Sequence, residues 1–155
     1  MRKKIRYAYK YTRHALKAKH TKGHGIHSPY LYRFTQNAVY EKNPFYLFNS
    51  IEALRESLKY DDRTIAMEDF GTGGNREIRV RDIAKSSLKR TRLAQLLYRV
   101  VNLTNAKNVL ELGTSLGITT AYLSSPSAEI KCISLEGSSA VAEIASKKKK
   151  KLEIS

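Results

Sequence analysis

The sequence predicts a mixed α/β fold in which two short buried strands are joined by a glycine turn and a helix. Val109 and Leu110, together with Leu112, make a short apolar run of the kind found in buried parallel strands. A second such run covers residues 130–135 and ends at Glu136. The order strand, glycine turn, helix, strand and acid is typical of the nucleotide-binding half of a doubly wound sheet.

The turn between the two strands contains two glycines with separate expected roles. Gly113 lets the chain turn sharply off the first strand, where a Cβ atom would be penalised. Gly117 lets the following helix approach the sheet or a ligand closely. That helix is expected to begin at Ile118, and Pro126 prevents it from running far. Its first backbone N–H groups have no partner within the helix, so they are available to polar or anionic ligand atoms.

Two acids mark the ends of the two predicted strands. Glu136 follows the second strand, where a carboxylate can accept hydrogen bonds from two ribose hydroxyls and disfavours a 2′-phosphate. Glu111 lies two residues before the first glycine, where it would repel a pyrophosphate and suit a cofactor with a cationic amino-acid end. The turn also departs from the dinucleotide pattern Gly-x-Gly-x-x-Gly, because Ser115 lies where a middle glycine is often found.

The stretch Glu111-Leu-Gly-Thr-Ser-Leu-Gly resembles motif I of class I S-adenosylmethionine-dependent methyltransferases, and is most similar to the bacterial O-methyltransferase-like branch. The resemblance implies a Rossmann-like methyltransferase fold, S-adenosyl-L-methionine as cofactor, and methylation of an oxygen acceptor that the sequence does not name. It places the glycine turn on the methionine side and Glu136 on the ribose. The residues expected to bind the cofactor are Glu111, Gly113, Thr114, Ser115, Gly117, Glu136 and Gly137.

Two alternatives to this cofactor remain open. A nicotinamide dinucleotide would place Glu136 on its adenosine ribose, and an ordinary α/β turn would bind nothing. The catalytic residues are not predicted, because those of the resembling enzymes usually lie beyond the part that this chain matches. The oligomeric state is not predicted either.

The rest of the chain is expected to form a cap and to begin the cofactor-binding domain. Residues 1–80 are expected to be a basic, mainly helical N-terminal cap, and residues 81–155 the start of the Rossmann-like domain. Apolar residues recur at helical spacing over 30–60 and 81–104, and Ser28 with Pro29 is a natural helix start. The glycine-rich stretch 61–79 is too charged and extended for a buried helix, so it is expected to be a surface loop, either a substrate-side lid or a turn without function.

Charge is concentrated near the N-terminus. The net charge is +15, and residues 1–33 hold ten of the 29 Lys and Arg residues, whereas the first acid is Glu41. Tyrosines are interleaved with these bases, a pattern that suits contact with nucleic acid. The alternative is a solvated helix whose tyrosines pack on the body of the protein. The excess positive charge also hints at an anionic methyl acceptor, which otherwise is an unspecified small molecule.

Neither a metal site nor a membrane segment is expected. His20, His24 and His27 lie close in sequence, but no acid or cysteine is near them and the glycines leave their geometry unfixed. Cys132 is the only cysteine, so it cannot form an internal disulfide, and we expect it to pack as a small apolar residue. No stretch has the length of a membrane span or the apolar core of a signal peptide, which favours the cytoplasm.

The number of strands is small for the implied fold. Only two convincing strands are present, and two parallel strands leave an apolar edge and face exposed. The chain is therefore expected to be a truncated form of a longer methyltransferase, with little activity alone. The alternatives are a complete small basic protein and a cofactor-binding remnant without activity.

Overall fold

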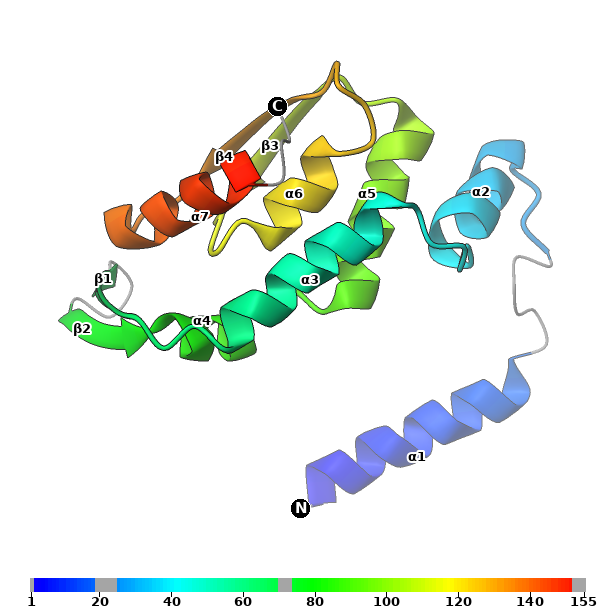
Figure 1. The fold of residues 1–155 in the computed structure, drawn as a ribbon. Helices are drawn as coiled ribbons and strands as arrows, with labels where there is room; N and C mark the ends of the chain where they lie inside the picture. The colour runs from blue at the N-terminus through cyan, green and yellow to red at the C-terminus, as the bar shows by residue number, and fades with distance from the viewer. Residues whose placement is uncertain (1, 19–24, 70–73, 152–155) are drawn as a thin grey trace. The chain divides into compact units, whose positions relative to one another are not determined.

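The computed structural model describes residues 2–18, 25–69 and 74–151, and the chain divides into two compact units, residues 1–41 and 42–155. The described residues form seven α-helices, one π-helical segment and two separate two-stranded sheets, which confirms the mixed α/β class (Figure 1). A larger doubly wound sheet is not present among them. None of the described helices is long and apolar enough to cross a membrane.

The first unit is mainly helical over its described part. It contains α1 (Arg2–Lys17), α2 (Pro29–Phe34) and a π-helical segment, η1 (Thr35–Val39). The Ser28 hydroxyl accepts a hydrogen bond from the backbone N–H of Leu31 at 3.4 Å, so the predicted start of α2 is confirmed. His20 and His24 lie outside the described residues, and the described part of the chain contains no group of three potential metal ligands.

The second unit begins with α3 (Leu47–Lys59), which leads into an antiparallel hairpin of β1 (Thr64–Asp69) and β2 (Gly74–Arg79). The expectation of a loop across residues 61–79 is therefore wrong for these two segments. Pairing with each other satisfies those backbone N–H and C=O groups that point toward the partner strand, despite the charged side chains. Three apolar side chains of the hairpin also pack on the core, namely Ile65, Met67 and Ile78. The glycine-rich residues 70–73 lie outside the described part.

The core of the second unit is built from the apolar stripes of its helices. The predicted helices over 81–104 are confirmed as α4 (Val80–Ser87) and α5 (Thr91–Thr104). In the centre of the core, the Phe48 ring meets the rings of Tyr98 and Tyr122 edge-on, at centroid distances of 5.0 and 5.2 Å. The boundary between the compact units falls after Glu41, so the helices and hairpin of residues 47–79 share this core.

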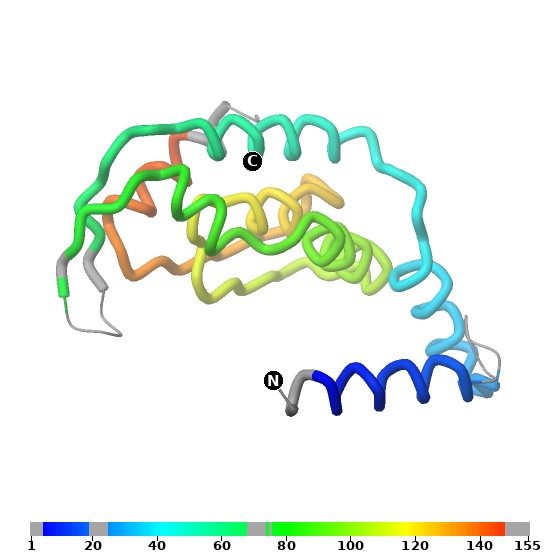
Figure 2. The backbone as a smooth tube through the Cα atoms, turned by 90° about the horizontal axis from the view of Figure 1, so that it is seen from below, coloured from blue at the N-terminus to red at the C-terminus, as the bar shows by residue number. Residues whose placement is uncertain are grey.

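The predicted strand–turn–helix–strand segment is confirmed. β3 (Asn108–Leu112) pairs in parallel with β4 (Lys131–Leu135), and α6 (Ile118–Ser124) connects them. The last described helix is α7 (Ser139–Lys151). Figure 1 shows α3, α6 and α7 on one side of the strand pair, and Figure 2 shows α3 running alongside α6.

The opposite face of this strand pair is open and apolar. It carries two pairs of large side chains that lie side by side in the register, Leu110 with Ile133 and Leu112 with Leu135. Their exposed fractions range from 49% to 77%. The exposed apolar face that two parallel strands were expected to leave is therefore present.

Candidate cofactor site

The glycine turn between β3 and α6 has three residues in the left-handed conformation. They are Gly113 at φ +91°, Ser115 at φ +49° and Gly117 at φ +80°. The expected sharp turn at Gly113 is thus confirmed, and a Cβ atom there would meet no other atom within 4 Å. A Cβ atom on Gly117 would lie 3.2 Å from Cβ of Ala145. Gly117 therefore allows close approach to α7, rather than to the sheet, while the expected approach to a ligand stays a prediction.

Hydrogen bonds fasten this turn to the end of β4. The N–H groups of Gly113 and Thr114 both donate to the carbonyl of Leu135, at 2.8 and 3.1 Å. The N–H of Ser115 donates to Glu136 Oε2 at 2.7 Å. These bonds join the ends of β3 and β4, because the donors come from the turn after β3 and the acceptors from the end of β4.

Glu136 bridges the turn and the start of α7. Its Oε2 accepts from Ser115 N, and its Oε1 accepts from Ser138 N at 3.2 Å. A carboxylate has about four acceptor positions, so two remain for hydroxyl groups of a ligand. Glu136 thus already has a structural role, which does not conflict with the ribose contact implied by the resemblance.

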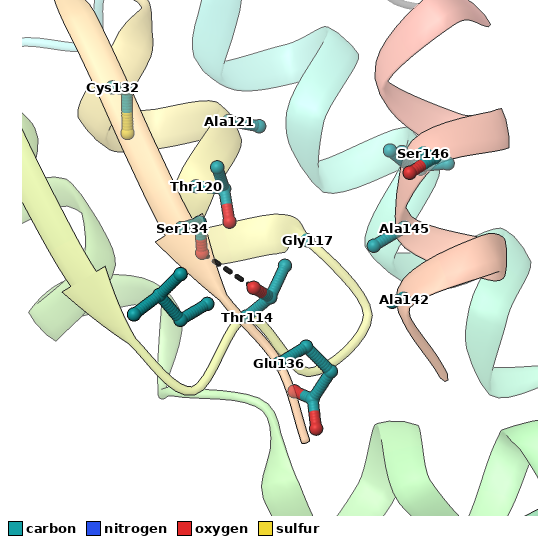
Figure 3. Close-up of a pocket in the computed structure, with 12 residues that line it drawn as sticks. Thr114, Gly117, Thr120, Ala121, Cys132, Ser134, Glu136, Ala142, Ala145 and Ser146 are labelled. Atoms are coloured by element: carbon teal, nitrogen blue, oxygen red, sulfur yellow. Dashed lines mark hydrogen bonds between the residues drawn. The ribbon is translucent and has the colours of Figure 1, made fainter. Parts of the chain in front are cut away.

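Glu111 points into the layer between the strands and α6, where it is buried. Its Oε2 accepts from Thr120 Oγ1 at 2.5 Å and from Ser134 Oγ at 2.6 Å. Ser134 Oγ also lies 2.6 Å from Thr114 Oγ1 (Figure 3). Because a carboxylate can only accept, the hydroxyl hydrogen of Ser134 is used on Glu111, and Thr114 must donate to Ser134. The free lone pairs of Thr114 Oγ1 are then left as acceptors.

Thr114 opens into a cavity of about 440 Å³ between α6, β4 and α7. This volume lies within the range of small-molecule sites, about 300–1,000 Å³. The polar groups on its wall are hydroxyls and the Glu136 carboxylate, and the remainder is apolar. No lysine or arginine lines it among the described residues. The lining residues are Leu54, Thr114, Gly117, Thr120, Ala121, Cys132, Ser134, Leu135, Glu136, Ala142, Ala145 and Ser146 (Figure 3).

A second cavity, of about 360 Å³, lies beside β3. The expected cofactor-binding residues are distributed between the two cavities. Gly117 and Glu136 line the first cavity, whereas Glu111, Gly113 and Ser115 line the second. Thr114 lines both, and Gly137 lines neither. The structure therefore does not bring the seven expected residues together around one cavity.

The prediction from sequence missed Thr120 and Ser134. Both line the first cavity and both donate to Glu111. The sequence offered one signal for Ser134, because it is a hydroxyl residue inside an apolar strand. That Glu111 is its register partner is known only from the structure. Cys132, on the same strand, packs as expected against a small apolar cluster with Val101 and Leu123.

Neither a protein-family model, a curated protein nor a solved structure matches this chain. The family therefore stays a prediction that depends on residues 111–117. What the structure adds is the chemistry of the cavity beside that motif: many hydrogen-bond acceptors, two nearby carboxylates and an apolar wall.

Proposed function

We propose that this protein binds S-adenosyl-L-methionine in the first cavity and acts as a methyltransferase on an oxygen acceptor. The observation that carries the proposal is the acceptor-rich wall next to the glycine turn, with Glu136 on the cavity and Glu111 behind Thr114 and Ser134. The ammonium and sulfonium groups of this cofactor are cations, which nearby carboxylates favour. The same carboxylates disfavour a pyrophosphate, which argues against a nicotinamide dinucleotide.

Each part of the cavity has a proposed partner on the cofactor. Glu136 has two acceptor positions left and accepts from the ribose hydroxyls. Thr114 Oγ1 accepts from the ammonium group, since its own hydrogen is used on Ser134. Leu54 and Ala121 supply apolar surface that suits the adenine ring. Gly113 and Ser115 line only the second cavity, so their proposed role is to hold the turn rather than to contact the cofactor.

The proposed reaction is a direct in-line displacement. The bond between sulfur and the methyl carbon breaks as the acceptor oxygen bonds to that carbon, and the electron pair stays on sulfur to give S-adenosylhomocysteine. The acceptor loses its proton to a base, and we assign no described residue to that role. The protein's contribution is to hold donor and acceptor in line and to exclude water.

We also propose that full activity needs further strands at the edges of the β3–β4 pair and helices over its open face. A Rossmann-like sheet has both faces covered, whereas this face is exposed at Leu110, Leu112 and their partners on β4. With this face uncovered, we expect cofactor binding with little turnover. A cytoplasmic location stays a prediction.

The proposal is tested by calorimetric titration of the chain with S-adenosylhomocysteine and, separately, with NAD. We expect S-adenosylhomocysteine to bind and Glu136→Gln to weaken it about 10- to 100-fold, as loss of hydrogen bonds to a charged group predicts. Glu129→Gln is the matched control. It removes the same charge from an exposed residue that pairs with Lys107 and does not line the cavity. Its affinity should equal that of the unaltered chain.

A second titration separates a ribose contact from loosening of the turn. The unaltered chain and Glu136→Gln are each titrated with the 2′-deoxy form of S-adenosylhomocysteine. If Glu136 contacts the 2′-hydroxyl, the variant should no longer distinguish the two ligands. If the losses of affinity from Glu136→Gln and from removal of the 2′-hydroxyl add up, Glu136 acts only by holding the turn. Binding of NAD alone would identify a dinucleotide site, and binding of neither ligand would refute the cofactor proposal.

A further inference from the structure

Helix α1 concentrates positive charge in a unit that holds far more bases than acids. The first unit holds ten of the 29 Lys and Arg residues but a single acid, Glu41 at its end. The described side chains of α1, residues 5–17, are all exposed. Among the described residues, no acidic side chain pairs with any of them.

The cations of α1 lie on one side of the helix. Arg6, Lys10, Arg13 and Lys17 recur at spacings of four, three and four residues, which places them in one stripe along the helix axis. With a rise of about 1.5 Å per residue, the stripe is roughly 16 Å long. Four cations in line over this length form a track for a chain of phosphates.

Aromatic rings border this stripe. Tyr7 and Tyr11 are four residues apart, so they lie on one face beside the cations, and their exposed fractions are 70% and 74%. Exposed rings next to a cationic track are the arrangement with which proteins bind single-stranded nucleic acid, because bases stack on the rings while the backbone follows the charges.

We propose that α1 binds single-stranded nucleic acid, with its basic stripe on the phosphates and Tyr7 and Tyr11 stacked on bases. This activity goes beyond the proposed cofactor site and does not depend on it. An anionic membrane surface is less favoured, because helices that lie in the membrane interface insert Trp, Phe and Leu side chains. In the described part of α1, the only large aliphatic side chains are Ile5 and Leu16.

The test measures binding of the full chain to a fluorescent 20-nucleotide oligouridine by anisotropy at several salt concentrations. Four phosphate contacts predict a slope of log affinity against log salt of about −3. The double variant Arg6→Gln with Lys10→Gln should reduce the slope by about 1.4. Glutamine is a good helix former, so α1 is retained. The matched control is Lys85→Gln with Arg92→Gln, which removes two exposed charges from the second unit and should leave the slope unchanged.

The tyrosines are tested separately from the charges. Tyr7→Ala and Tyr11→Ala should each weaken binding about tenfold while leaving the salt slope unchanged, because stacking releases no counterions. No binding at low salt, or an unaltered slope in the Arg6 and Lys10 double variant, would overturn the proposal. Sedimentation with vesicles of phosphatidylserine and phosphatidylcholine is the comparison. Binding to vesicles without binding to oligouridine would identify α1 as a membrane-surface helix instead.

Discussion

Ser115 is a non-glycine residue held in the left-handed region, which predicts that glycine at this position stabilises the protein. At φ +49° a side chain costs about 1–2 kcal/mol, whereas glycine loses about 0.5–1 kcal/mol of additional chain entropy on folding. The backbone effect alone should therefore favour Ser115→Gly by about 0.5–1 kcal/mol. The Ser115 hydroxyl is also buried without a hydrogen-bond partner among the described residues, which costs about 1 kcal/mol more.

Urea unfolding of three variants separates these two contributions. Ser115→Ala removes the hydroxyl and keeps the left-handed strain, and Ser115→Gly removes both, for a total gain of about 1–2 kcal/mol. Both keep the N–H that donates to Glu136. Asn105→Gly is a control at φ +51°, where asparagine tolerates this conformation and the gain should be smaller. If Ser115→Gly is no more stable than Ser115→Ala, the turn does not hold residue 115 under strain in solution.

Three further predictions concern the same corner of the fold and the core below it. Gly117→Ala should destabilise the protein by about 2–4 kcal/mol in urea unfolding, because the added Cβ meets Ala145 at 3.2 Å in a left-handed backbone. Gly113→Ala, which meets no neighbour, should cost only about 1–2 kcal/mol, and equal losses would contradict the role given to α7. Tyr122→Phe should cost about 1 kcal/mol, because the Tyr122 hydroxyl donates to Glu52 at 2.8 Å. Burial, followed by the hydrogen bond to Glu52, raises the pKa of Tyr122 above its ordinary value of about 10. The folded state then holds this proton more tightly than the unfolded state. That stability is complete below about pH 10 and is lost as pH rises further, so the melting temperature of Tyr122→Phe should fall less steeply above pH 10. If the melting temperatures of the unaltered protein and of Tyr122→Phe fall equally above pH 10, the pKa of Tyr122 does not cause the alkaline loss of stability.

The segment from β3 to β4 could be predicted because its signals are local. Short apolar runs mark the strands, Gly113 marks the turn, and Pro126 lies just beyond the end of α6. The β1–β2 hairpin could not be predicted in the same way. Its strands are charged and lack a clear apolar alternation, so their structure depends on pairing with each other and on the core beneath them.

The chemistry of the site was less predictable than its position. The spacing of Glu111 and Glu136 indicated two acids near the glycine turn, which the structure confirms. It could not indicate that Glu111 accepts from Ser134 and Thr120, because that contact depends on strand register and on how α6 packs. Likewise, the need for a glycine at residue 117 was visible, but the neighbour that requires it, Ala145, comes from a helix 28 residues further along the chain.

The open face of β3 and β4 bears on the proposed function independently of the cofactor cavity. Full burial of a Leu or Ile side chain contributes about 1.5–3 kcal/mol, and Leu110, Leu112, Ile133 and Leu135 each have 49–77% of their surface exposed. Burying the exposed surface of these four side chains would contribute several kcal/mol, which is comparable with the whole free energy of unfolding of a small domain. A layer of helices over this face would thus stabilise the fold more than any single substitution considered above. The same layer is what a parallel nucleotide-binding sheet carries on its second face, so the apolar face and the glycine turn are two separate observations in favour of the proposed Rossmann-like fold.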